Sequence, residues 1–81
     1  MIGRGRDRKM KRFVLREEYI KLGQLLKAVG LVDSGVEAKI HITNGEVKVN
    51  NEVELQRGKK LHAGDTVEYN GEKIEIAGSG A

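Results

Sequence analysis

Apolar residues recur along this chain with two different periods, and the first period is helical. The spacing i, i+3, i+4, i+7, which is typical of one face of a helix, is occupied by Leu22, Leu25, Leu26 and Val29. Gly30 follows directly and is suited to end a helix. The pattern predicts a first helix that begins at about Leu22.

A second segment, residues 34–43, carries two signals that disagree. Ser34 followed by Glu37 matches a capping box and favours a helix start. The apolar positions that follow alternate, as in a strand: Val36, Ala38, Ile40 and Ile42. On a helix they form two i, i+4 pairs on nearly opposite faces, which suits a short helix wedged between another helix and a sheet. The box, a stop at Asn44-Gly45 and a length of about ten residues favour the helix.

The later segments have the period of strands and are separated by turn residues. Residues 46–49 alternate apolar and charged, Asn50-Asn51 suits a tight turn, and Val53 and Leu55 continue the alternation on a return strand. A second hairpin is predicted from residues 66–69 and 73–76 around Asn70-Gly71. Residues 13–20 suit a short strand or a strap that leads into the first helix.

Charge divides the chain unequally. Residues 1–16 carry seven basic groups and one acid, a net charge of +6, whereas residues 17–81 carry eight basic and eleven acidic groups, a net charge of −3. We expect a flexible basic arm over residues 1–12, a folded domain over 13–77 and a flexible tail over 78–81. The arm could contact a polyanion or serve only as a solvated tail.

Several classes of function lack the residues they need. There is no cysteine, so a thiolate metal site is excluded and a disulfide framework is too. His41 and His62 have no metal-ligand spacing, and no phosphate-binding loop motif is present. We expect no catalytic residues, no metal and no cofactor. No apolar run is long enough for a membrane span, so we expect no membrane association and a cytoplasmic location.

Basic residues of the folded part suggest a binding surface for a polyanion. The segment 56–62 has three cations and no acid although the chain from residue 17 onward is net acidic. Aromatic residues are few, which disfavours base stacking and favours recognition of backbone and shape in structured RNA. The candidate binding residues are Lys21, Gln24, Lys27, Ser34, Lys39, Arg57, Lys59 and Lys60.

Five short motifs resemble a known family. They are residues 20–27 (IKLGQLLK), Ser-Gly-x-x-Ala-Lys at 34–39, Gly-x-Val-x-Val-Asn at 45–50, Arg-Gly-x-Lys-Leu at 57–61 and Gly-Asp-x-Val at 64–67. Together they resemble the S-four RNA-binding domain, or alpha-L motif, and most of all its small stand-alone bacterial members. The resemblance covers roughly residues 17–77.

The resemblance implies an α+β fold in which two short helices form an L against a small, mostly antiparallel sheet. It implies that residues 34–43 are helical, and that basic residues on the helices and adjoining loops hold RNA. We therefore expect a non-enzymatic protein that binds structured RNA, ribosomal or transfer, with the ribosome as a candidate partner. The alternative is an adaptor that docks on a ribosomal or enzyme partner. An RNA-modifying enzyme would need a catalytic domain supplied by a partner.

Overall fold

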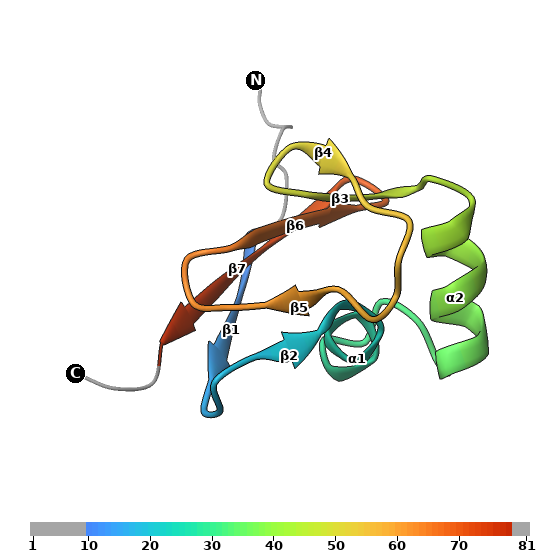
Figure 1. The fold of residues 1–81 in the computed structure, drawn as a ribbon. Helices are drawn as coiled ribbons and strands as arrows, with labels where there is room; N and C mark the ends of the chain where they lie inside the picture. The colour runs from blue at the N-terminus through green and yellow to red at the C-terminus, as the bar shows by residue number, and fades with distance from the viewer. Residues whose placement is uncertain (1–9, 79–81) are drawn as a thin grey trace, which may run out of the picture.

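The computed structural model describes residues 10–78, which form seven strands and two helices (Figure 1). In chain order the elements are β1 (Met10–Leu15), β2 (Ile20–Lys21), α1 (Leu22–Ala28), α2 (Gly35–Thr43), β3 (Val47–Val49), β4 (Glu52–Val53), β5 (Lys60–Leu61), β6 (Thr66–Tyr69) and β7 (Glu72–Gly78). Neither helix in this part of the chain has the length and apolar character that crossing a bilayer requires.

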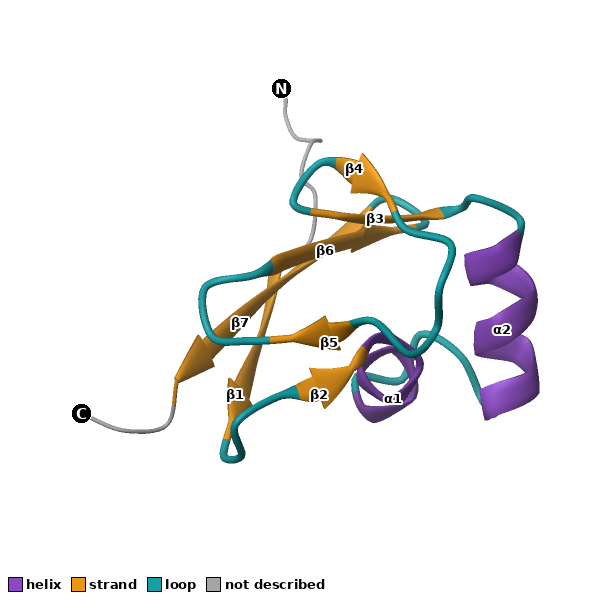
Figure 2. Ribbon diagram, viewed as in Figure 1, coloured by secondary structure: helices purple, strands orange, loops and turns teal. Residues whose placement is uncertain are grey.

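Five of the strands form one mostly antiparallel sheet in the order β1-β7-β6-β3-β4 (Figure 2). The pairs β7-β6, β6-β3 and β3-β4 are antiparallel, and β1 runs parallel to β7. β2 and β5 form a separate antiparallel pair beside α1. The first and last strands of the domain are therefore hydrogen-bonded neighbours in the sheet. The hairpin signals in the sequence did not predict this pairing.

The two hairpin turns have the backbone that their sequences predict. Asn50 and Asn51 have φ of 52° and 72°, and Asn70 and Gly71 have φ of 55° and 80°. Left-handed residues at both central positions give a turn whose twist matches that of the flanking strands. Asn50 adds a tertiary role, since its side chain donates to Asp65 Oδ1 at 3.1 Å and accepts from the Thr66 backbone N–H at 3.0 Å.

Both predicted helices are present, and they form an L, with α1 seen end-on and α2 from the side (Figure 1). Leu22, Leu25 and Leu26 of α1 are fully buried. At the start of α2, Ser34 Oγ accepts from the Glu37 N–H at 3.1 Å. The Glu37 carboxylate accepts from the Asp33 N–H at 2.7 Å, one residue farther back than in the usual capping box.

The prediction that α2 is wedged between two layers is wrong. Ala38 and Ile42 are fully buried, but Val36 and Ile40 on the opposite face are 68% and 50% exposed. The sheet and α1 contact one face of α2 only, because α2 lies at the outer edge of the fold (Figure 1). The alternating apolar pattern thus buries one i, i+4 pair and exposes the other.

Two predicted boundaries also differ from the structure. The strand β1 begins at Met10, so residues 10–12 belong to the sheet and not to a flexible arm; Lys11 and Arg12 pair with Glu72 and Glu75 of β7. The rest of the predicted arm, residues 1–9, lies outside the described residues, and so do residues 79–81 of the predicted tail, whereas Gly78 ends β7.

The return strand after the first hairpin is shorter than its alternation predicted. β4 ends at Val53, and Val53 and Leu55 are both about half exposed. As the edge strand, β4 has a neighbour on one side only, so little apolar surface is available to cover these side chains.

Candidate nucleic-acid interface

The loop between β4 and β5 is tied to the beginning of α1 by backbone hydrogen bonds. The first N–H groups of a helix have no partner within the helix. Here the Leu22 N–H donates to the Lys59 carbonyl at 2.9 Å, and the Gly23 N–H donates to the Arg57 carbonyl at 3.0 Å. These bonds bring a loop that is more than thirty residues away in sequence against the first turn of α1.

Gly23 lies directly against the loop at this contact. A Cβ atom at position 23 would lie 3.5 Å from Arg57 Cβ and 3.6 Å from the Arg57 carbonyl oxygen. These are ordinary van der Waals distances, so a methyl group there would touch Arg57, and Arg57 is positioned beside α1. A glycine inside a helical pattern costs about 1 kcal/mol relative to alanine, and Gly23 is the sequence feature that could have pointed to a packing contact at this position.

An open groove of about 580 Å³ lies between α1, the β4–β5 loop and the start of α2, and we call it the basic groove. Its lining consists of Lys21, Gly23, Gln24, Lys27, Ala28, Gly35, Arg57 and Gly58. Four of the eight predicted binding residues, Lys21, Gln24, Lys27 and Arg57, are thus brought together. Glycine and alanine supply the rest of the wall, so the cations border a shallow and accessible surface.

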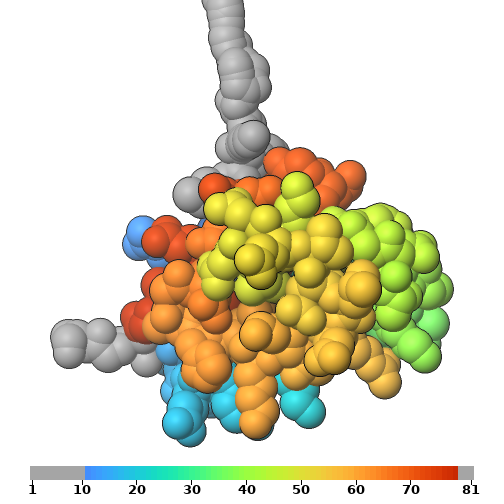
Figure 3. Space-filling model, turned by 45° about the horizontal axis from the view of Figure 1, so that its top comes forward, coloured from blue at the N-terminus to red at the C-terminus, as the bar shows by residue number. Residues whose placement is uncertain are grey.

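The remaining predicted residues flank the basic groove. Lys60 lies directly opposite Lys21 in the β2–β5 pair, so both side chains project from the same face. Lys59 lies in the β4–β5 loop, and its backbone carbonyl accepts the hydrogen bond from the Leu22 N–H of α1. Figure 3 shows this neighbourhood in space-filling form, with cyan residues near position 20 and orange residues near position 60 side by side.

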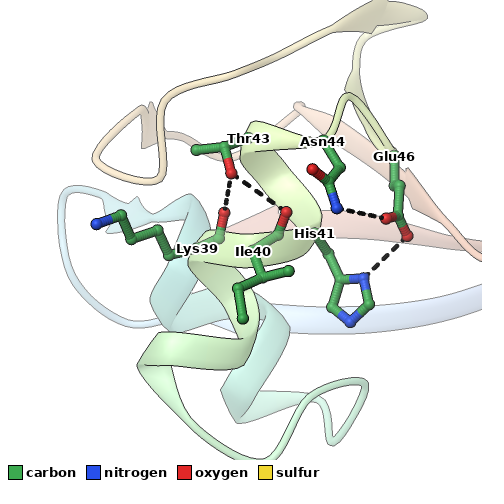
Figure 4. Close-up of polar contacts among 6 residues, drawn as sticks. All are labelled: Lys39, Ile40, His41, Thr43, Asn44 and Glu46. Carbon is green, nitrogen blue, oxygen red and sulfur yellow. Dashed lines mark hydrogen bonds and ion pairs between the residues drawn. The ribbon is translucent and has the colours of Figure 1, made fainter.

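Two residues of α2 complete the set. Ser34 is the N-cap, and its hydroxyl oxygen is engaged by the Glu37 N–H, so it positions the helix start next to Gly35. Lys39 is exposed one helical turn after Gly35 and therefore on the groove side of α2. In Figure 4, Lys39 points outward from one side of the helix, and the contact between His41 and Glu46 lies on the other side.

Gln24 is partly committed to local structure. Its side-chain oxygen accepts from the Lys21 N–H at 3.3 Å. The amide NH₂ group is therefore the part of Gln24 that is left to donate to a ligand in the groove.

Cations on the sheet and cations at the groove differ in their partners. On the sheet, Lys11, Arg12 and Lys73 each lie within 3.9 Å of a glutamate. Over residues 10–78, no groove cation forms an ion pair with a carboxylate; this set consists of Lys21, Lys27, Lys39, Arg57, Lys59 and Lys60. Among residues 10–78, six of the eight cations without an ion pair thus lie in or beside the groove, and the other two are Arg16 and Lys48. The groove gathers most of this unpaired charge in a domain that is net acidic from residue 17 onward.

The histidines have structural surroundings. His41 Nδ1 is 2.9 Å from Glu46 Oε1, and its ring lies 5.3 Å from that of Tyr69 (Figure 4 shows the first contact). His62 is exposed and lies 6.4 Å from the Tyr19 ring, measured between centroids. Within residues 10–78, no cluster of three or more His, Asp or Glu side chains could hold a metal ion.

The fold and the groove together define a small two-helix domain that presents unpaired cations on one face. Residues 13–77 match the family model of the S4 domain, and the chain belongs to this family. The prediction of that family and of its α+β architecture is confirmed.

Relatives with related descriptions support the assignment. YbcJ of Escherichia coli K12 is 38% identical over 61 residues, which cover 75% of this chain and 87% of YbcJ. A Bacillus subtilis 168 protein named "Probable ribosome maturation protein RlbA" is 46% identical over 54 residues, 67% of this chain and 76% of that protein. The solution structure of E. coli YbcJ, described as an alpha-L motif involved in RNA binding, matches with a TM-score of 0.61 and 34% identity over 95% of this chain and 96% of YbcJ.

Proposed function

We propose that this protein is a non-enzymatic RNA-binding protein that holds structured RNA, ribosomal or transfer, in the basic groove. The observation that carries the proposal is the cluster of unpaired cations around an accessible groove. Lysine and arginine at such a surface neutralise phosphates and release the counterions that surround them. The structure of YbcJ, described as RNA-binding, and the name of RlbA, which refers to ribosome maturation, both support the proposal.

The basic groove is best suited to recognise the shape and the phosphate backbone of an RNA. The cations in and beside it come from the two helices, the strands β2 and β5 and the β4–β5 loop, so they are spread over a surface and do not follow a single strand. The grooves of an A-form helix are recognised mostly through phosphates and 2′-hydroxyl groups. Arg57 can bind a phosphate with two parallel N–H groups, whereas the lysines act as point charges.

Charge reversal in the β4–β5 segment tests the proposal. We expect the triple variant Arg57→Glu, Lys59→Glu and Lys60→Glu to abolish retention of structured RNA in an electrophoretic mobility assay with ribosomal and transfer RNA fragments. The circular dichroism spectrum should not change, because all three side chains are exposed.

A matched control carries the same change of net charge on the sheet: Lys11→Glu, Lys48→Glu and Lys73→Glu. This control should retain most of the RNA affinity, provided that its spectrum shows it folded. If the groove variant binds as tightly as the unaltered protein, the proposal is wrong.

An adaptor that docks on a protein is the second candidate. The observation in its favour is the exposed apolar pair Val36 and Ile40 on the outer face of α2. Binding through such a face would vary little with salt, whereas binding to phosphates weakens steeply as salt rises. A salt titration of the protein with a ribosomal fraction therefore separates the two candidates.

A further inference from the structure

A second hollow adjoins the basic groove and has different chemistry. It measures about 470 Å³ and shares Lys21 and Gln24 with the groove. Its other walls are Glu17, Glu18 and Tyr19, and we call it the Tyr19 hollow. A ligand that follows the groove past Lys21 therefore reaches an aromatic ring and two carboxylates.

One cation lies against the Tyr19 ring. Lys60 Nζ lies 4.8 Å from the ring centroid, which is a cation–π contact. Lys21 and Lys60 lie opposite each other across the β2–β5 pair, and two like charges at such positions destabilise the pair slightly. The contact of Lys60 with the Tyr19 ring offsets part of this cost and holds the Lys60 ammonium group beside the hollow.

Carboxylates at this end of the groove select against a phosphate. Glu17 and Glu18 repel the RNA backbone, but a carboxylate accepts hydrogen bonds from the amino group of a base. An aromatic ring offers a surface on which any unpaired base can stack. The walls of the Tyr19 hollow therefore suit a base, while the basic groove suits the backbone.

We propose that the Tyr19 hollow receives one unpaired nucleobase of the bound RNA, stacked on Tyr19, and prefers adenine, cytosine or guanine over uracil. Lys21 and Lys60 hold the adjoining phosphates. This inference rests on the proposed function and extends it, because it adds recognition of a base to a surface otherwise suited to backbone contacts. The preferred RNA is then a helical stem with an unpaired nucleotide next to it.

Three RNA hairpins with the same stem test the site by competition binding. One is blunt, one carries a short overhang of adenosines, and one carries an abasic overhang with the same phosphates. We expect the adenosine overhang to bind roughly fivefold or more tightly than the abasic one, because stacking on one aromatic side chain supplies at least that much. The comparison with the abasic overhang removes the contribution of the added charge.

Two variants of Tyr19 identify the residue responsible. Tyr19→Leu should bind the adenosine and the abasic overhangs equally, and Tyr19→Phe should retain the preference for adenosine. Equal binding of the two overhangs by the unaltered protein overturns the Tyr19 site and leaves the proposed function intact. Failure to bind any of the hairpins, the blunt one included, overturns the proposed function itself.

The carboxylates have their own comparison. An overhang of uridines, which present an acceptor where adenine and cytosine present an amino group, should bind roughly fivefold more weakly than adenosines. The double variant Glu17→Gln and Glu18→Gln should reduce this difference, since an amide can donate as well as accept. Equal affinity of the unaltered protein for the two overhangs overturns the selection by amino groups.

Discussion

At the scale of single residues, Glu46 links the end of α2 to the sheet. Its carboxylate lies 2.9 Å from His41 Nδ1 and accepts from Asn44 Nδ2 at 3.4 Å (Figure 4). The His41 ring in turn lies against Tyr69 of β6. One acidic side chain just before β3 therefore connects the last turn of α2 to the start of that strand, and His41 has a structural role there.

Tyr69 gives a prediction about pH. Burial, with the nearby charges of Glu46 and Glu37, raises the pKa of Tyr69 above its usual value of 10.0. Because the folded state holds this proton more tightly than the unfolded state, stability is fully present below about pH 10 and falls as pH rises through the higher folded pKa. We expect Tyr69→Phe to weaken this alkaline loss of stability, measured by urea denaturation at several pH values.

The titration can also be observed directly. The chain has two tyrosines, so Tyr19→Phe leaves Tyr69 as its sole phenol. The ultraviolet absorbance of the phenolate in that variant should then show a midpoint above that of the urea-unfolded protein. A midpoint that does not move on unfolding would contradict the assignment.

At the scale of elements, α2 illustrates how one segment serves two environments. Its buried residues, Ala38 and Ile42, join the core, while Lys39 lies toward the basic groove and Val36 and Ile40 face outward. The N-cap at Ser34 fixes where this helix begins, and hence which side chain lies at each of these positions.

Two isoleucines on the same helix test this arrangement. Ile42→Ala should lower the free energy of unfolding by about 2–5 kcal/mol, because it leaves a cavity in the core. Ile40→Ala, two positions earlier, removes the same atoms from a half-exposed site and should cost less than about 1 kcal/mol. Urea denaturation of both variants measures the difference, and equal losses would show that both faces of α2 are covered.

At the scale of the whole molecule, the ion-paired cations of the sheet and most of the unpaired cations lie in different places. Ion pairs connect neighbouring strands of the sheet, as in Lys73 with Glu68, whereas the basic groove holds cations without such partners. Exposed ion pairs contribute little to stability. They place a carboxylate beside Lys11, Arg12 and Lys73, so these three cations are less suited to hold a polyanion than the unpaired cations of the groove.

The salt dependence of binding measures this separation. Lys27→Ala should weaken RNA binding and lower the slope of log K against log salt by roughly 0.7–0.9, the contribution of one phosphate contact. Lys73→Ala, on the sheet, should leave the slope unchanged. Similar slopes for the two variants would place the phosphate contacts outside the basic groove.

Sequence reasoning succeeded where the interaction is local. The spacing of Leu22, Leu25 and Leu26 predicted α1, the Ser34 cap predicted α2, and the Asn50-Asn51 and Asn70-Gly71 pairs predicted both hairpin turns. Each of these signals operates over a few residues, through helical periodicity, a capping hydrogen bond or a left-handed backbone. The family and its fold also followed from short motifs of this kind.

Contacts between distant segments were less predictable. The pairing of β1 with β7 joins the two ends of the domain, and Gly23 meets Arg57 across more than thirty residues. The exposed pair on α2 was misplaced because alternating apolar residues do not say how many layers surround a helix. The eight predicted binding residues remain predictions as RNA ligands, although the structure places four of them in one groove.

The sequence by itself determined the helices, the turns, the family and the excess of basic residues, because each depends on neighbouring residues or on composition. Only the tertiary structure decided which cations are paired and which are free, since pairing depends on strands that meet across the sheet. It also decided that the groove continues into a hollow walled by Tyr19 and two glutamates. Backbone hydrogen bonds from α1 to the β4–β5 loop bring the walls of the groove together. These bonds join segments more than thirty residues apart, and the local pattern of residues does not predict which distant segments will meet.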